Sequence, residues 1–242
     1  MNDKLYHECY RHVCQARSLL ENLQAWGFDT VTPVLKKSDV GSVVDEKIVP
    51  APDVVKTLDE LKDEVERCQR CSLARSRSKT VFARGNPRAD LVFVGEAPGF
   101  EEDRQGLPFV GEAGGLLDRI LFAMGLSEKD VYICNLIKCR PPANRNPAAD
   151  ELAACRPYLE CQLSLLEPRV IVTLGRFAAQ LLLAVQTPVS HLRGNWYQYQ
   201  GVAVLPTFHP AFLLRSPAAK KLVWEDMKKV KQRLISEGCK LN

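Results

Sequence analysis

The sequence predicts an α/β fold in which a parallel β-sheet is covered by helices on both faces. The first observation is a set of four short, almost continuously apolar runs, typical of buried strands, at 91–96, 131–137, 170–174 and 202–208. The second is that stretches with helical spacing alternate with these runs, at 115–124, 148–166, 176–184 and 218–236. The third is that polar residues follow the runs directly, where ligands of such sheets bind.

The N-terminal part of the chain differs from this pattern. Residues 3–26 have apolar side chains at roughly helical spacing, so we expect an amphipathic helix that ends at Gly27. Residues 30–52 contain Pro, Gly, Ser and charges without either periodicity, which predicts a linker. The chain is therefore divided into an N-terminal helical extension (1–29), a linker (30–56) and a main domain (57–242).

The composition is that of a globular protein without a membrane span. Of 242 residues, 46% are apolar and 26% are charged, and no run of about 18 apolar residues occurs. The polar N-terminus is unlike a signal peptide, so a cytoplasmic location is expected. Residues 211–242 hold eight Lys and Arg against three Asp and Glu. That basic end suits a phosphate backbone as partner, but a solvated helix face would look the same.

Nine cysteines without an export signal favour metal ligation over disulfide bonds. Two form a C-x2-C motif and two follow with C-x15-C spacing: Cys68, Cys71, Cys139 and Cys155. Four thiolates can close a tetrahedral zinc site or hold a [4Fe–4S] cluster. A coincidental or redox-active C-x2-C pair is the alternative, and Cys134, on an apolar run, is expected to be core packing.

The segment GEAPGFEEDRQGLPFVGEAGGLL, residues 95–117, contains more turn-forming residues than a simple turn needs. It places Glu96 at the end of the first apolar run and carries Phe109 in its centre. Asn135 lies near the end of the second apolar run, and His209 follows the fourth. Because the carboxyl ends of parallel strands meet at one edge of a sheet, we expect a small ligand to bind there.

Five sequence blocks occur together with the four-cysteine spacing. In chain order they are GEAPGFEED (95–103), GLPFVGEAGGLL (106–117), NLIKCRPPANRNP (135–147), TLG (173–175) and HPAFLLR (209–215). They resemble the family 4 uracil-DNA glycosylases, the iron–sulfur branch of that superfamily, over about residues 57–236. The resemblance implies a three-layer α/β/α domain with a central four-stranded parallel sheet. It also implies hydrolysis of the N-glycosidic bond of uracil in DNA, and a structural [4Fe–4S] cluster on the four cysteines.

The resemblance assigns several residues to a uracil base that has been swung out of the DNA. Phe109 would stack on the base, although a core phenylalanine is the competing interpretation. Asn135 would accept from N3–H and donate to O4, a pattern that cytosine inverts. Gly95 and Ala97 would line the same site, and Glu102 would block the C5 methyl group of thymine.

Three further residues are expected to act on the glycosidic bond. Glu96 would orient the attacking water and stabilise positive charge on the sugar, with an ion pair to a nearby arginine such as Arg104 as the competing interpretation. Asn144 would support Glu96 or its water. His209 would donate to O2 as negative charge develops on the departing base, although a histidine before proline is otherwise a polar turn residue.

The block HPAFLLR is expected to contact DNA. Leu213 and Leu214 would enter the base stack as an apolar wedge, and Arg215 would bind phosphate together with Lys220 and Lys221. The competing interpretation is that the leucines begin the last helix and face the core.

Other classes of protein share some of these features. An electron-transfer iron–sulfur protein is disfavoured, because the compact ferredoxin cysteine run is missing. A non-catalytic iron–sulfur DNA-binding or polymerase-associated module needs only the basic end and the aromatic residues. One superfamily branch traps uracil covalently through a histidine in an inserted loop; CRPPANRNP lacks both, so turnover is expected. We further expect a monomer. Its N-terminal extension would bind a replication or repair protein, although an extension that only tethers the domain or keeps it soluble would look the same.

Overall fold

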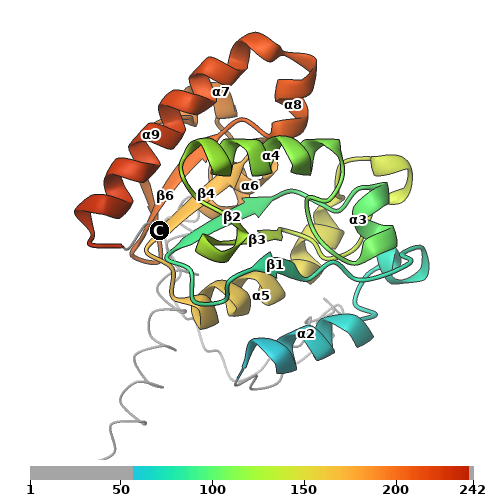
Figure 1. Ribbon diagram of the computed structural model, residues 1–242. Coiled ribbons are helices and arrows are strands. Elements are labelled where there is room, and N and C mark those ends of the chain that lie inside the picture. The colour runs from blue at the N-terminus through green and yellow to red at the C-terminus, as the bar shows by residue number, and fades with distance from the viewer. Residues whose placement is uncertain (1–56, 240–242) are drawn as a thin grey trace, which may run out of the picture. The chain divides into compact units, whose positions relative to one another are not determined.

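The structure, a computed structural model, describes residues 57–239 (Figure 1). The predicted extension (1–29) and linker (30–56) lie outside the described residues. The strands are β1 (Ala83–Gly85), β2 (Leu91–Gly95), β3 (Val131–Asn135), β4 (Val170–Leu174), β5 (Tyr197–Tyr199) and β6 (Val202–Thr207). They form one sheet in the order β1-β3-β2-β4-β6-β5. The predicted α/β class is confirmed.

The sheet is larger than the four parallel strands that were expected. The central strands β3, β2, β4 and β6 are parallel to one another, and they correspond to the four apolar runs. β1 and β5 join the two edges in antiparallel orientation, so the sheet is mixed and six-stranded. Each edge strand has only three residues, which is too short for alternating hydrophobicity to be recognised in the sequence.

The helices agree with the sequence where they are long. They are α2 (Leu58–Arg67), α3 (Phe100–Gln105), α4 (Glu112–Ala123), α5 (Ala149–Leu166), α6 (Arg176–Leu183), α7 (Val189–Leu192), α8 (Pro210–Arg215) and α9 (Lys220–Ser236), with 3-10 turns η1 (Ser72–Arg75), η2 (Glu128–Asp130), η3 (Pro142–Asn144) and η4 (Pro217–Ala219). The short helices α3, α7 and α8 were not predicted, because four to six residues do not show a full amphipathic pattern. Among residues 57–239, no helix combines the length and apolar character that a membrane crossing requires.

Helices cover both faces of the sheet, as the continuous apolar strands predicted (Figure 1). Leu91 and Phe93 of β2 pack into a core cluster with residues of α4, α8 and α9. Val92 and Val94 of the same strand pack on the other face against α5 and α6. Alternate side chains of one strand thus belong to two separate cores, which is why its residues are apolar without interruption.

The carboxyl ends of the parallel strands lie at one edge of the sheet. Gly95 of β2 is opposite Asn135 of β3, and Leu174 of β4 is opposite Thr207 of β6. The hydrogen-bond ladder continues one residue further, since the N–H of Leu136 donates to the carbonyl of Gly95 at 3.0 Å. The segments that follow these strands, including the long loop after β2, therefore begin side by side.

Candidate active site

Asn135 and Gly95 lie side by side at the ends of neighbouring strands. A Cβ atom on Gly95 would lie 2.3 Å from Oδ1 of Asn135 and 2.6 Å from Cζ of Phe109, which is closer than real Cβ contacts allow. Only glycine at position 95 therefore lets the amide and the ring meet against the backbone. The structure brings together three of the residues that the sequence assigned to base binding.

The side-chain amide of Asn135 is buried with an unused acceptor. Asn135 is 2% exposed, and within the described part of the chain its Oδ1 has no hydrogen-bond partner. A buried polar atom left unpaired costs about 1–3 kcal/mol, so native proteins keep few of them without a functional reason. The amide is ready to accept a hydrogen bond from a guest at the end of β3.

Phe109, in the loop between α3 and α4, has a backbone conformation that L-amino acids seldom adopt. Its φ angle is 56°, in the left-handed region, and the ring is buried. The ring stacks on the imidazole of His209 with 5.5 Å between ring centroids. A Cβ atom on Gly114 would lie 1.8 Å from the carbonyl oxygen of Phe109, so α4 needs glycine there. Strained residues of this kind cluster at binding sites.

The carboxylate of Glu102 holds the loop that carries Phe109. Oε1 accepts hydrogen bonds from the backbone N–H groups of Val110 and Gly111, each at 3.0 Å, and Oε2 accepts from Gly99 at 3.1 Å. One side chain of α3 thus joins the loop after β2 to the start of α4. Glu102 was expected to form a wall against the thymine methyl group, whereas both of its oxygens are engaged with backbone N–H groups.

His209 caps the N-terminus of α8, and this contact determines which ring nitrogen carries the proton. Nδ1 accepts a hydrogen bond from the backbone N–H of Ala211 at 3.1 Å, so in the neutral ring the proton is on Nε2. Burial, together with the charge of Arg215, lowers the pKa of His209 to about 4 against the opposing effect of Glu102. At neutral pH His209 is therefore an uncharged N–H donor.

Glu96 follows β2 directly and is half-buried. Burial raises the pKa of its carboxyl above the ordinary value, and the positive charge of Arg176, the first residue of α6, opposes that shift. Arg104, the example named from the sequence, pairs with Glu101 on α3 at 2.7 Å, whereas Arg176 is the nearby arginine whose charge acts on Glu96. The next residue, Ala97, is half-buried and packs against the core on the α5 face.

Asn144 lies in the turn η3 and is exposed. Its Oδ1 accepts a hydrogen bond from Nε of Arg140 at 2.7 Å, and the Arg140 guanidinium lies 5.1 Å from the centre of the Phe100 ring. Across residues 57–239, no hydrogen bond joins Asn144 to Glu96. The structure places Asn144 with the arginine that follows Cys139 rather than with the carboxylate it was expected to support.

The residues of α8 after His209 lie in different environments. Leu213 is 0% exposed and belongs to the core cluster shared with α4 and α9, so the expectation that it wedges into DNA is wrong. Leu214 is half-buried, and Arg215 is exposed. Successive residues of a helix point about 100° apart, which separates these neighbours. Leu214 and Arg215 keep the surface that a DNA contact requires, and so does the half-buried Phe212.

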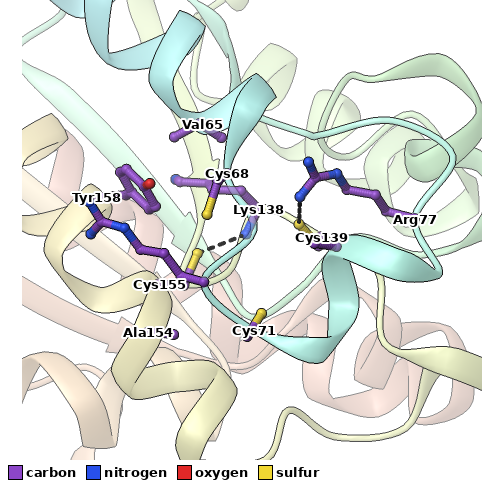
Figure 2. Close-up of a pocket in the computed structure, with 11 residues that line it drawn as sticks. Val65, Cys68, Cys71, Arg77, Lys138, Cys139, Ala154, Cys155 and Tyr158 are labelled. Atoms are coloured by element: carbon purple, nitrogen blue, oxygen red, sulfur yellow. Dashed lines mark hydrogen bonds between the residues drawn. The ribbon is translucent and has the colours of Figure 1, made fainter. Parts of the chain in front are cut away.

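The four predicted metal ligands all line one cavity (Figure 2). Cys68 ends α2, Cys71 precedes η1, Cys139 follows β3 and Cys155 belongs to α5. Among the described residues, no group of three or more Cys, His, Asp or Glu is arranged to hold a single metal ion. Two thiols from one turn and two from distant positions thus line the same cavity, as a tetrahedral metal site or a cluster requires.

N–H donors of two arginine side chains and of one backbone amide line this cavity. Nη1 of Arg77 donates to Sγ of Cys139, and the backbone N–H of Lys138 donates to Sγ of Cys155, both at 3.3 Å. Arg70 also lines the cavity; its Nη2 pairs with a glutamate on α2, but its buried Nη1 has no partner among the described residues. An unused buried donor beside four sulfur atoms indicates a guest that carries acceptor atoms and negative charge.

Sequence reasoning missed Glu151, which supports this cavity from the first turn of α5. Glu151 is 1% exposed and accepts two hydrogen bonds from Arg145, at 2.6 and 2.8 Å, and one from Oγ of Ser72 at 3.3 Å. It therefore joins the helix of Cys155 to the turn that begins after Cys71. Hydrogen bonding by Arg145 lowers the pKa of Glu151 to about 2. A glutamate at the third position of a helix is the capping signal that indicates such a role.

Known proteins resemble this chain over its described part. Residues 82–228 match the sequence model of the uracil DNA glycosylase superfamily. The chain is 43% identical over 194 residues to a type-4 uracil-DNA glycosylase of Saccharolobus solfataricus, covering 76% of this chain and 90% of that protein. It is 42% identical over 182 residues to a type-4 uracil-DNA glycosylase of Thermotoga maritima, covering 74% and 95%. A type-5 uracil-DNA glycosylase of Pyrobaculum aerophilum is 31% identical over 173 residues, covering 64% and 75%. On the superfamily match and these type-4 relatives, the chain belongs to the uracil-DNA glycosylase superfamily, in its type-4 family.

Proposed function

We propose that this protein releases uracil from DNA by hydrolysing its N-glycosidic bond, which leaves an abasic site in the strand. The observation that carries the proposal is the buried, unpaired Oδ1 of Asn135 beside Phe109, whose ring stacks on His209. The type-4 relatives are named uracil-DNA glycosylases, which supports the same activity here. The non-catalytic DNA-binding alternative is not favoured.

Recognition of uracil depends on the direction of its hydrogen bonds. Swinging the base out of the duplex costs a few kcal/mol, and stacking on Phe109 returns about 1–3 kcal/mol. Oδ1 of Asn135 accepts from N3–H of uracil while Nδ2 donates to O4. Cytosine offers an acceptor at N3 and a donor at C4, so the same amide would leave groups on both partners unpaired.

Cleavage separates charge, and two side chains stabilise the separated charges. As the bond from C1′ to N1 breaks, uracil leaves with negative charge that is partly on O2, where Nε2–H of His209 donates. An uncharged histidine suffices because its hydrogen bond strengthens as the charge develops. Glu96 orients the water that adds to C1′ and stabilises the positive charge on the sugar.

Other residues position these groups or hold the DNA. Glu102 fixes the loop of Phe109 through backbone N–H groups. Leu214, in place of the buried Leu213, enters the space that the flipped nucleotide leaves, and Arg215 binds phosphate. Asn144 acts through Arg140 on the turn that follows the third cysteine.

The four cysteines fit a [4Fe–4S] cluster. The cavity lined by all four cysteines and the unused donor of Arg70 support a cluster, whose sulfur atoms and negative charge that donor can meet. Bound there, the cluster supplies a cross-link and no step of the hydrolysis. Its ligands join the end of α2, the segment after β3 and α5, and thereby hold the segment that begins with Asn135.

The test is uracil release from a single-uracil oligonucleotide, measured as strand cleavage at abasic sites after alkali. We expect cleavage at the uracil position only, and none in the matched thymine oligonucleotide. The Asn135→Asp variant, purified in parallel, excludes a contaminating glycosylase. A protein that binds the oligonucleotide without making abasic sites would be the non-catalytic module, and a stable covalent adduct would contradict turnover.

Three expectations about the protein outside its site stay predictions: a cytoplasmic location, a monomer, and an N-terminal extension that binds a repair or replication protein. The family match begins at residue 82, so a chain that starts at residue 57 should still release uracil. Loss of activity on that deletion would contradict the predicted domain division. Light scattering of the full chain checks the monomer.

A further inference from the structure

Lys138 is a buried ammonium group that the proposed mechanism does not use. It lies between Asn135 and Cys139 in the chain and is 1% exposed. Its Nζ donates hydrogen bonds to the backbone carbonyl of Asn135 at 2.9 Å and to Oε1 of Gln162 at 2.6 Å. Lys138 thus holds the peptide group of the residue whose side chain reads the base.

The contacts of this ammonium group are all uncharged. Nε2 of Gln162 donates to the hydroxyl of Tyr132 at 2.7 Å, so the carbonyl oxygen of Gln162 is kept turned toward Lys138. Nζ also lies 5.7 Å from the centre of the Phe82 ring. Burial raises the pKa of the Cys134 and Cys155 thiols, and the charge of Lys138 opposes that shift. Among residues 57–239, no carboxylate forms an ion pair with Lys138. A buried charge without an opposite charge is strongly destabilising, so a nearby anion would stabilise this ammonium group.

The cysteine cavity is the place where such an anion binds. Lys138 lines it, and Figure 2 shows this residue among the cysteine side chains. Its own backbone N–H donates to Sγ of Cys155. Four thiolate ligands bring more negative charge than a [4Fe–4S] core brings positive charge, so the ligated cluster is anionic. The positive charge of Lys138 and the negative charge of a ligated cluster are thus complementary.

We propose that Lys138 is a positioning residue that connects the cysteine cavity with base reading. The negative charge of the ligated cluster balances the buried ammonium group, and the ammonium group fixes the peptide of Asn135. This inference rests on the proposed glycosylase function and on a cluster in the cavity. It accounts for the placement of the base-reading amide and a cysteine ligand only four residues apart, at 135 and 139.

The first test follows loss of the cluster from the full-length, cluster-loaded protein in excess iron chelator, by the decay of its visible absorbance. Lys138→Met removes the positive charge and keeps a side chain of similar length. Gln162→Glu replaces the amide that contacts Nζ with a carboxylate of nearly the same shape, which gives the ammonium group an opposite charge within the protein. Both variants should lose the cluster several-fold faster than the wild type. In the first the positive charge is absent, and in the second the new carboxylate neutralises it, so neither protein balances the negative charge of the cluster. Lys129→Met, which removes an exposed lysine, is the matched control and should keep the wild-type rate.

Each outcome of the chelation test is decisive. An unchanged rate in Gln162→Glu overturns the charge link even if Lys138→Met fails to fold. Equal acceleration in Lys129→Met also overturns it, because the effect would then follow from net charge alone. If the wild-type protein releases no uracil, the proposed function fails, but these rates still decide whether Lys138 balances the cluster.

The second test separates positioning from simple stabilisation. Single-turnover uracil release by the cluster-loaded Lys138→Met protein should slow about tenfold, because a displaced reading amide costs rate in the bound complex. Affinity for uracil-free DNA should stay within a factor of about two, since that surface is unchanged. A normal rate in a loaded but less heat-stable variant would reduce Lys138 to a stabilising residue and overturn the proposal.

Discussion

The base-reading end of the sheet and the cysteine cavity leave different kinds of polar atom unpaired among the described residues: an acceptor at the strand ends and a donor, Nη1 of Arg70, in the cavity. At the strand ends, Oδ1 of Asn135 is buried without a partner, and His209 uses one ring nitrogen for capping and keeps the other as a donor. In the cavity, the sulfur atoms of Cys139 and Cys155 already accept hydrogen bonds from N–H groups. A transient guest must supply the missing hydrogen bonds itself, and that requirement gives specificity. A permanent guest is instead held by an environment matched to its charge.

The two regions also differ in backbone strain and yet share one segment. The reading end depends on Phe109 at a φ of 56° and on a close approach at Gly95. The cavity depends on side chains that brace ordinary helices, as Glu151 does for α5. Residues 135–139 belong to both. A change in one region is therefore expected to reach the other through that segment, whereas changes elsewhere stay local.

The largest effect is expected where the unpaired acceptor is altered. Asn135→Asp should lower kcat/KM for uracil release roughly 10³-fold, because the donor to O4 is lost and a site built for hydrogen bonding tolerates mismatch poorly. Asn144→Asp is the matched control, since that asparagine is exposed and paired with Arg140; it should change the rate by only a few-fold. The measurement is single-turnover cleavage. Similar losses in both variants would remove the distinction between the buried and exposed asparagines.

A pH profile tests the acid and the histidine at the reading end together. Burial raises the pKa of Glu96 above 4.5, so falling pH should protonate it and slow uracil release while His209, with a pKa of about 4, is still uncharged. Glu96→Gln should be about 10²-fold slower and should lack this acidic decline. Single-turnover rates between pH 4 and 8 check both statements. A decline centred near 6.5 would instead indicate that His209 has to be uncharged and titrates normally.

Loosening the strained loop should have a smaller effect. Glu102→Ala removes the acceptor of three backbone N–H groups, so Phe109 loses its fixed position and kcat/KM should fall about tenfold. Phe122→Ala, which removes an exposed ring from α4, is the control and should leave the rate unchanged. If Glu102→Ala instead gains activity on thymine without losing activity on uracil, Glu102 is the methyl-excluding wall that the sequence suggested.

The smallest effect concerns the brace of the cavity. Because Arg145 holds the folded-state pKa of Glu151 near 2, below the ordinary 4.5, Glu151 adds stability at pH values above about 4.5. That contribution is lost as pH falls from 4.5 toward 2. Glu151→Gln should lower the melting temperature by a few degrees at pH 7 and by less at pH 3. Equal melting temperatures of both proteins at pH 7 would contradict the role of the Glu151–Arg145 pair.

Particular residues show which features of the fold and of the site could be predicted from the sequence. The four central strands were predicted because each is buried on both faces and therefore apolar throughout, a property that is visible along the chain. Leu213 and Leu214 were indistinguishable, because both are large and apolar and their environments depend on which way a six-residue helix faces the core. The contacts by which Glu102 holds its loop, and those of Lys138, could not be predicted from the sequence, because folding brings their backbone and side-chain partners near.

The sequence by itself determined the fold class, the family and the four cysteines, because these reside in local composition, spacing and ordered motifs. Only the tertiary structure decided which polar atoms stay unpaired and which nitrogen of His209 carries its proton. It also decided that Leu213, and not Leu214, is buried in the core. Those outcomes depend on packing between segments up to about a hundred residues apart, since burial and hydrogen-bond partners are properties of neighbours in space.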